Sequence, residues 1–300
     1  MDGLNTEAST AGSWSGHLDD EDMLDTAGDL PVPRGRMSMR QVAGPAGGKV
    51  YLYLPRGWEP GAPVLVAVHG ISRNAREQVQ MFAPWAERCG FAIVAPLFTR
   101  DRYRDYQRLG LEKGGRRSDA FLDAALEAFE RWTGAPPRPV AMFGFSGGAQ
   151  FAHRYALLRP ERVEALVLGA AGWYTMPDPE QAYPLGVAHV PVTGALPYRE
   201  WLRLPMLVLV GSHDTERDDA LRQSPEVDAA QGAHRLERAQ RFAAAMRAAA
   251  ARCGVESRVE FAVMHGVGHG FSESMRRGGL AAQALPFLGL AAPMTSGVQE

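Results

Sequence analysis

An abrupt change from a strand pattern to a helix pattern at residues 144–148 constrains the fold more than any other feature of this chain. An apolar run that begins at Val140 ends in Gly144-Phe145-Ser146-Gly147-Gly148, and a helical stretch over 149–158 follows at once. A tight strand-to-helix turn brings backbone segments too close for a Cβ, which accounts for the glycines. Such a turn, a nucleophile elbow, lifts a serine Oγ clear of the backbone. Ser146 is therefore the candidate nucleophile of a catalytic site.

The remaining sequence alternates between short apolar runs and helical patterns, which predicts βαβ units and a mostly parallel sheet. Besides the strand before Ser146, strands are expected at residues 49–54, 64–68, 91–95, 165–169, 206–210 and 259–263. Helices are expected at residues 75–89, 118–133, 149–158, 234–251 and 272–286. The 300 residues fit one α/β domain, placed at 38–295, after an acidic and poorly ordered tail at 1–37.

One segment interrupts the alternation. Residues 172–204 contain five prolines and five tyrosines or tryptophans, a composition that one regular helix cannot accommodate. We interpret the segment as an insertion after the sixth strand, lying over the C-terminal edge of the sheet, where open α/β sheets bind ligands. A lid or pocket wall is the functional interpretation, and an irregular crossover loop is the alternative.

A serine hydroxyl needs a base to take its proton and an acid to orient that base. After a nucleophile elbow these partners follow in the order Asp or Glu, then His. Asp214 comes just after the strand at 206–210, and His269 comes after the strand at 259–263 with a glycine on each side. We therefore predict a catalytic triad of Ser146, Asp214 and His269.

Residues near Asp214 and near His269 are alternative candidates for the catalytic acid and the catalytic base. His265 lies nearer the strand end than His269, and Asp218 or Asp219 could replace Asp214 if the loop is longer than expected. The histidines for which a structural role is expected are His69, His153 and His213.

An oxyanion hole needs two backbone N–H groups aimed at the developing negative charge. One is the N–H of Gly147, the residue after the nucleophile, and the other should come from the loop after the strand at 64–68. In that loop the pair His69-Gly70 presents the N–H of Ile71. For substrate binding we expect a mainly apolar pocket, with an arginine contact from the loop 100–106 and with the aromatic residues Phe98, Trp173, Tyr174 and Trp201.

With these motifs, the chain over residues 38–290 resembles the α/β-hydrolase superfamily. The motifs are His69-Gly70, Gly144 to Gly148, Gly211 to Asp214 and Gly268-His269-Gly270. Within the superfamily it is most similar to esterases of the polyhydroxyalkanoate depolymerase-like and dienelactone-hydrolase-like branch, through His69-Gly70 and the helix end Trp85 to Phe91. Dienelactone hydrolases use a cysteine nucleophile, where this chain has Ser146. The resemblance implies an α/β-hydrolase fold with a serine nucleophile.

The composition and the sequence patterns limit the classes of partner and the cellular location that are expected for this protein. The net charge of −2 gives no electrostatic footprint for nucleic acid or an anionic membrane. No apolar run approaches the roughly 18 residues of a membrane span, and residues 1–30 lack the features of a signal peptide. Cys89 and Cys253 do not form a metal-ligand spacing and are expected to be reduced. The expected location is the cytoplasm.

The sequence thus predicts a serine hydrolase that cleaves a carboxylic ester of a small or medium-sized substrate through an acyl-enzyme. Thioesterase, lactonase, amidase or acyltransferase activity on the same triad is the alternative. A catalytically silent binding protein of the same fold would lack at least one triad member. No cofactor or metal is expected, because the chain has neither a G-x-G-x-x-G after its first strand nor a metal-ligand cluster.

Overall fold

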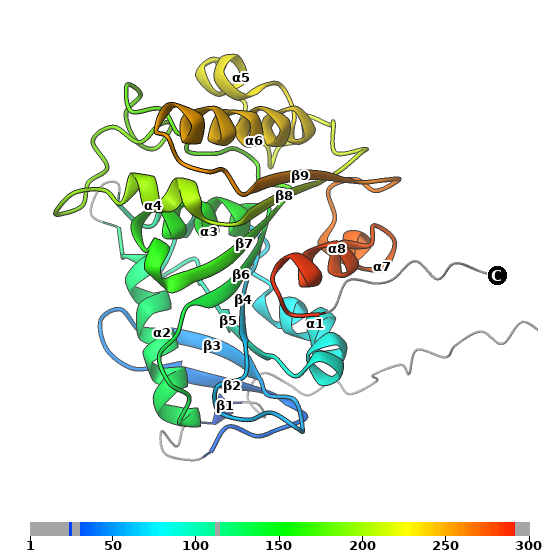
Figure 1. Cartoon of the computed structure of the whole chain (residues 1–300). Helices are drawn as coiled ribbons and strands as arrows, with labels where there is room; N and C mark the ends of the chain where they lie inside the picture. The colour runs from blue at the N-terminus through cyan, green and yellow to red at the C-terminus, as the bar shows by residue number, and fades with distance from the viewer. Residues whose placement is uncertain (1–23, 26–30, 112–114, 292–300) are drawn as a thin grey trace, which may run out of the picture.

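The computed structural model describes residues 24–25, 31–111 and 115–291 of the chain (Figure 1). Most of the predicted tail 1–37 therefore lies outside the described residues. Within that tail, Leu24–Asp25 form a short strand, β1, which pairs in parallel with the strand that begins at Met37. No helix of the described part is long and apolar enough to cross a bilayer.

The described strands form one sheet in the order β1-β2-β3-β5-β4-β6-β7-β8-β9. After β1 they are β2 Met37–Val42, β3 Gly48–Tyr53, β4 Val64–Val68, β5 Ala92–Pro96, β6 Val140–Phe145, β7 Val163–Gly169, β8 Met206–Gly211 and β9 Val259–Met264. Strand β3 is antiparallel to both of its neighbours, β2 and β5, and all other pairs are parallel. The sheet is therefore mostly parallel, as the alternating pattern predicts.

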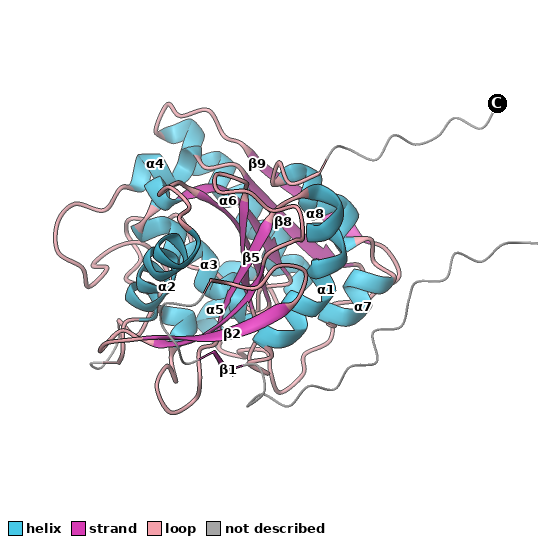
Figure 2. Cartoon of the chain, turned by 90° about the horizontal axis from the view of Figure 1, so that it is seen from below, coloured by secondary structure: helices cyan, strands magenta, loops and turns pink. Residues whose placement is uncertain are grey.

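Helices cover both faces of this sheet, as Figures 1 and 2 show. They are α1 Ala75–Cys89, α2 Ser118–Thr133, α3 Gly147–Leu158, α4 Tyr198–Arg203, α5 Pro225–Gln231, α6 Arg235–Arg252, α7 Phe271–Arg276 and α8 Leu280–Phe287. Short 3-10 helices, η1 and η2, lie at Tyr106–Arg108 and Pro160–Arg162. One face carries α1, α7 and α8, and the other carries α2, α3, α4 and α6 (Figure 1).

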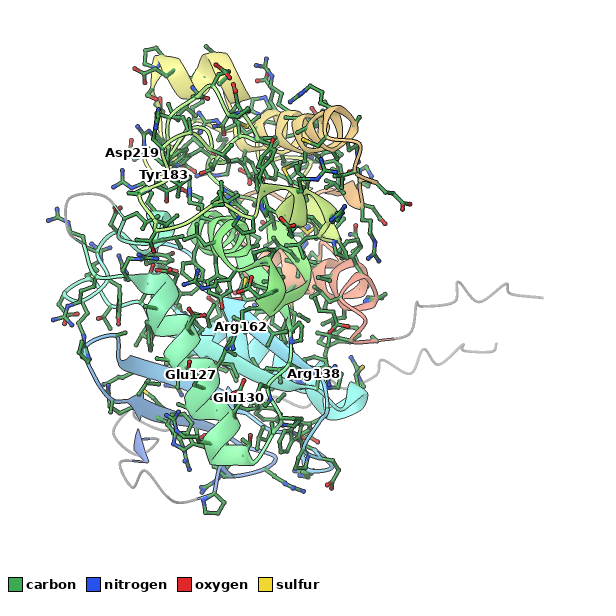
Figure 3. The ribbon with its side chains drawn as sticks, turned by 60° about the vertical axis from the view of Figure 1, so that its left-hand side comes forward. Glu127, Glu130, Arg138, Arg162, Tyr183 and Asp219 are labelled. Atoms are coloured by element: carbon green, nitrogen blue, oxygen red, sulfur yellow. The ribbon has the colours of Figure 1, made fainter. Side chains whose placement is uncertain are left out.

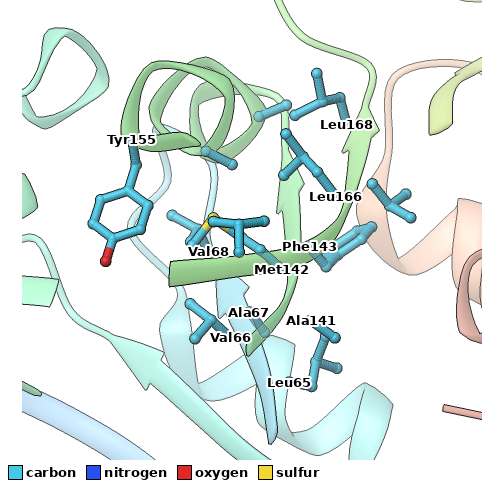
Figure 4. Close-up of a cluster of buried hydrophobic side chains, with 14 of the residues drawn as sticks. Leu65, Val66, Ala67, Val68, Ala141, Met142, Phe143, Tyr155, Leu166 and Leu168 are labelled. Carbon is cyan, nitrogen blue, oxygen red and sulfur yellow. The ribbon is translucent and has the colours of Figure 1, made fainter. Parts of the chain in front are cut away.

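The core lies where the central strands are covered on both faces. Every residue of β4 and of β6 is buried, and Figure 4 shows their side chains packed with those of β7. A parallel strand that is covered on both faces needs an apolar residue at every position. This explains why continuous apolar runs, without alternation, predict these strands.

The predicted bounds of α1 and α2 match the structure. The bounds of the predicted strands, of α3 and of α6 match within two residues. The capping of α1 explains its sharp limits. The Asn74 side chain accepts the N–H of Glu77 at 3.1 Å, and Gly90 ends the helix in the left-handed region at φ 80°.

Sequence reasoning missed β2 and α5 and joined α7 to α8. Strand β2 carries Ser38 and Arg40, whose side chains are nevertheless buried, and the Arg40 guanidinium lies 5.2 Å from the ring centroid of Trp132 in α2. The expected helix over 272–286 is divided at Gly279, which adopts a left-handed φ of 64° before α8 begins.

Residues 172–204 are irregular except for the short helix α4. Their aromatic side chains, however, point into the protein. Tyr174 and Trp201 are fully buried, and Tyr174 stacks on Phe242 of α6 with ring centroids 4.1 Å apart. The guanidinium groups of Arg154 and Arg222 both lie over the ring of Trp173, at 4.3 and 4.7 Å from its centroid. The aromatic residues thus fasten the segment to the domain.

We expect Trp201→Ala to lower the free energy of unfolding by about 3–5 kcal/mol, because it removes a large, fully buried side chain and leaves a cavity. Chemical denaturation measures this loss, and Trp201→Phe, which keeps part of the volume, should lose less. Relative rates on esters of different acyl length should stay constant in both variants. A marginal change in stability with an altered acyl preference would contradict the placement of Trp201 in the core.

Candidate active site

The turn between β6 and α3 holds Ser146 in a strained conformation, with φ 54° and ψ −114°. Residues other than glycine rarely adopt a positive φ, and such strain clusters at functional sites. A Cβ on Gly144 would lie 2.3 Å from the carbonyl oxygen of Gly148, and a Cβ on Gly148 would lie 2.1 Å from that of Val68. These contacts explain why the sequence needs glycine on both sides of the serine.

The loops after β8 and β9 bring an aspartate and a histidine to this serine. The Nε2 of His269 lies 3.0 Å from the Oγ of Ser146, and the Nδ1 of His269 lies 2.8 Å from the Oδ2 of Asp214. A carboxylate accepts hydrogen bonds, so Nδ1 carries the proton of the neutral imidazole, and Nε2 is free to accept from the serine hydroxyl. This series of hydrogen bonds can withdraw the hydroxyl proton of Ser146 and stabilise the imidazolium that forms on His269.

Asp214 is buried, with 1% of its side chain exposed, and has a second partner that sequence reasoning missed. The guanidinium of Arg235, also 1% exposed, contacts the Oδ1 of Asp214 at 3.3 Å and the carboxylate of Asp218 at 2.9 and 3.0 Å. The hydrogen bond from Arg235 is the main cause that holds the pKa of Asp218 below its ordinary value. Asp218 thus binds Arg235, and Asp214 is the carboxylate that contacts the imidazole.

His213, His265 and Asp219 lie outside the hydrogen-bonded chain that ends at the serine hydroxyl. All three residues are exposed, and Figure 3 shows Asp219 at the surface of the molecule. His265 lies in the turn that directly follows β9, in which Gly266 adopts a left-handed φ of 73°.

His69 and His153 are fully buried and hold backbone segments in place. The Nε2 of His69 accepts the N–H of Phe98 at 3.0 Å, and its Nδ1 lies 2.8 Å from the carbonyl oxygen of Gly70. Burial lowers the pKa of His69 to about 4, so it stays neutral. His153 binds the N–H of Thr175 at 2.9 Å in the same manner, and burial lowers its pKa as well.

Ile71 and Gly147, the residues whose N–H groups are expected to form the oxyanion hole, lie close to each other. Gly147 is the first residue of α3, and a Cβ on it would lie 3.0 Å from the Cγ2 of Ile71. A Cβ on Gly70 would lie 3.5 Å from the Cβ of Ser146, so the loop of His69 to Ile71 packs directly against the elbow. The first N–H groups of a helix have no partner within the helix, which leaves that of Gly147 available for an anion.

A cavity of about 320 Å³ opens beside the serine. Its lining comes from the elbow, from the loop before α1 with its first turn, from the loop before α7 with its first turn, and from one residue of the loop after β8. The lining residues are Gly70, Ile71, Ser72, Asn74, Glu77, Gln78, Phe145, Ser146, Ala220, His269, Gly270, Phe271, Ser272 and Glu273. The Ser272 hydroxyl donates to the Glu77 carboxylate and thereby joins the two first turns.

The prediction of an aromatic pocket is corrected by this lining. Phe98, Trp173, Tyr174 and Trp201 do not line the cavity, and each is at most 5% exposed. Phe98 packs among the rings of His69, Tyr106 and Phe151. Their large apolar surfaces are more stable in the core than beside a polar site, and aromatic composition alone does not distinguish the two placements. The position of α1 after the loop of His69 to Ile71, and of α7 directly after the loop that carries His269, would have been the better signal.

We expect Asp214→Asn to lower turnover by a factor on the order of 10³–10⁴, because an amide no longer fixes the imidazole in the tautomer that leaves Nε2 free. Steady-state kinetics on an activated ester measures the loss. The matched control is Asp219→Asn in the same loop, whose exposed side chain should change turnover little. Full activity of the Asp214→Asn variant would assign the acid to another residue.

No protein-family model and no curated protein sequence matches the chain. Among solved structures, it is similar to poly(aspartic acid) hydrolase-1 from Sphingomonas sp. KT-1, with a TM-score of 0.72 and 25% identity over 79% of this chain and 95% of that chain. A poly(3-hydroxybutyrate) depolymerase from Bordetella parapertussis has a TM-score of 0.69 and 28% identity over 82% of this chain and 88% of its own. A ferulic acid esterase shares the fold, with a TM-score of 0.57 and 17% identity over 85% and 98% of the two chains.

Fold and similarity together define the class: the protein is a hydrolase with the α/β-hydrolase fold. Within that class it resembles the esterase branch that includes polyhydroxyalkanoate depolymerase-like enzymes. In the described part of the chain, no group of three or more His, Cys, Asp and Glu side chains is arranged to hold a metal ion.

Proposed function

We propose that this protein is a serine hydrolase that cleaves a carboxylic ester of a small or medium-sized substrate. The observation that carries the proposal is the unbroken hydrogen-bond chain from Asp214 through His269 to Ser146, which ends at a strained elbow beside an open cavity. The similarity to a poly(3-hydroxybutyrate) depolymerase at 28% identity supports an ester as the substrate class.

In the proposed mechanism the Oγ of Ser146 attacks the ester carbonyl while the Nε2 of His269 takes the hydroxyl proton. Asp214 stabilises the imidazolium, and the N–H groups of Ile71 and Gly147 bind the oxyanion of the tetrahedral intermediate. Each such donor contributes about 2.7–4 kcal/mol to transition-state stabilisation. The imidazolium then returns the proton to the leaving alcohol. Water, activated by the same imidazole, finally releases the acyl group from Ser146.

Amide cleavage is the second candidate function. The chain is 25% identical to a poly(aspartic acid) hydrolase, and poly(aspartic acid) is joined by amide bonds. The same triad can attack an amide, because His269 can give its proton to a leaving amine.

A substrate panel tests both candidates. It contains p-nitrophenyl esters of increasing acyl length, aryl esters, a thioester, a lactone and the p-nitroanilides of the same acyl groups. We expect saturable hydrolysis of esters, and faster turnover of a p-nitroanilide than of its ester would favour the amidase. Absence of turnover together with absence of labelling by a fluorophosphonate would refute the serine hydrolase itself.

A further inference from the structure

A second cavity, of about 610 Å³, adjoins the active site and is lined largely by arginine. Its lining consists of Ile71, Arg73, Arg100, Asp101 and Arg104. Ile71 also lines the cavity beside Ser146, so the two hollows meet at this residue. Three guanidinium groups against one carboxylate make the second cavity electropositive, although the chain as a whole carries a net charge of −2.

Arg73 lines this cavity with a guanidinium group that is held in place by its neighbours. Its guanidinium donates to the carbonyl oxygens of Phe98, of Tyr103 at 3.2 Å and of Arg104 at 3.1 Å, and it lies 5.0 Å from the ring centroid of Tyr106. Carbonyl groups and an aromatic ring orient a guanidinium without neutralising its charge. Arg73 thereby also holds the loop that carries the other two arginines.

Arg100 and Arg104 are exposed, and neither forms an ion pair with a carboxylate of the described residues. Asp101, the acidic residue of the lining, forms no ion pair within 4 Å of any of the three guanidinium groups either. The pKa of Arg73 is lowered first by burial; repulsion from Arg100 also lowers it, whereas Tyr106 and Asp101 raise it. A bound anion would weaken the repulsion between the guanidinium groups of Arg73 and Arg100.

Ile71 connects the arginine-lined cavity with the place where the substrate carbonyl would react. Its N–H is the proposed oxyanion donor, and the residue is 44% exposed, with its side chain against Gly147 at the junction of the two cavities. A substrate whose carbonyl oxygen binds at Ile71 can extend past that side chain into the arginine-lined cavity. Guanidinium groups bind carboxylates through paired, charge-assisted hydrogen bonds.

We propose that Arg73, Arg100 and Arg104 form a subsite for a substrate carboxylate, so that the enzyme prefers esters bearing a free carboxylate over their neutral counterparts. This inference rests on the proposed function, since it names the substrate class of the same site. The proposed subsite affects which substrate charge is preferred, and the chemistry of the triad is the same for both kinds of ester.

Two matched pairs of substrates test the preference. The pair p-nitrophenyl hydrogen suberate and p-nitrophenyl methyl suberate differs by a carboxylate on the acyl side, and para-acetoxybenzoate and para-acetoxybenzamide differ by one on the alcohol side. We expect the wild type to give a higher kcat/KM on the anionic member of at least one pair. The ratio should fall as salt is added, because exposed charges are screened.

Arg100→Ala with Arg104→Ala should lower this anionic-to-neutral ratio about tenfold, the effect of losing a charged hydrogen bond. The fold should persist, because both side chains are exposed and Arg73 binds the backbone carbonyl of residue 104, which alanine retains. Arg276→Ala removes one exposed positive charge from α7, outside the arginine-lined cavity, and should leave the ratio unchanged.

Equilibrium binding separates this proposal from the proposed function. Suberate should bind to the Ser146→Ala variant and should bind at least about tenfold more weakly when Arg100 and Arg104 are also replaced by alanine. If the wild type hydrolyses neither pair, the proposed function fails and this binding result alone decides the subsite. The subsite would be overturned if the wild type preferred neither anionic substrate. It would also be overturned if the anionic-to-neutral ratio of kcat/KM survived the loss of Arg100 and Arg104, or if suberate bound equally well without these two side chains.

Discussion

Ser146→Ala will lower ester hydrolysis by a factor on the order of 10⁶ and abolish labelling by a fluorophosphonate. The expected size follows from the position of the hydroxyl, which lies 3.0 Å from the imidazole in an elbow that presents it to the cavity. Alanine leaves the oxyanion donors in place, so weak residual catalysis over the uncatalysed reaction should remain. Steady-state rates and mass-spectrometric mapping of the labelled residue measure the two effects.

The matched control is Ser72→Ala, which removes another hydroxyl from the lining of the same cavity. This variant should retain fluorophosphonate labelling at Ser146, because Ser72 has no imidazole beside it. Alanine at position 146 removes little volume, so both variants should unfold at the wild-type denaturant concentration. Covalent labelling that persists in the Ser146→Ala variant would assign the nucleophile to another residue.

His269→Ala should lower turnover about as far as Ser146→Ala, because the hydroxyl then has no acceptor for its proton. Members of a triad act as a unit, and the double variant Ser146→Ala with His269→Ala should therefore cost little more than either single change. Kinetics on one activated ester for the two single variants and the double variant gives the comparison.

His265→Ala provides the control for this prediction. His265 lies four positions earlier, is exposed, and should tolerate alanine with nearly full activity. If the loss of activity instead followed His265, the loop after β9 would have to rearrange before catalysis, and the hydrogen bonds described above would not be those of the active enzyme.

Sequence patterns predicted the central part of the fold because strong local constraints coincide there. A strand buried on both faces must be apolar at each position, and the elbow must carry glycines where a Cβ would collide with backbone. The loops that carry Asp214 and His269 follow such strands, so the alignment of parallel strand ends predicted where these side chains meet. The short separation of the three side chains is a structural finding that the patterns did not determine.

Features that depend on contacts between distant segments escaped the sequence. Arg235 begins an ordinary helix, and nothing in its neighbours indicates that its guanidinium reaches Asp214. Strand β2 was missed because Arg40 reads as an exposed residue until Trp132 covers it. The pocket residues were misassigned because aromatic richness accompanies burial in the core as well as ligand binding. In each case the deciding partner is far away in the chain.

The position of β9 has a consequence for how heat inactivates the enzyme. His269 follows this strand, which among the described strands forms one edge of the sheet and pairs with β8 alone, whereas Ser146 follows β6 in the interior of the sheet. Edge elements with partly exposed residues, such as Phe261 and Val263, open locally at a lower free energy than central strands do. Such an opening separates the imidazole from the serine while most of the chain stays native. Inactivation should therefore precede global melting and be reversible on brief heating.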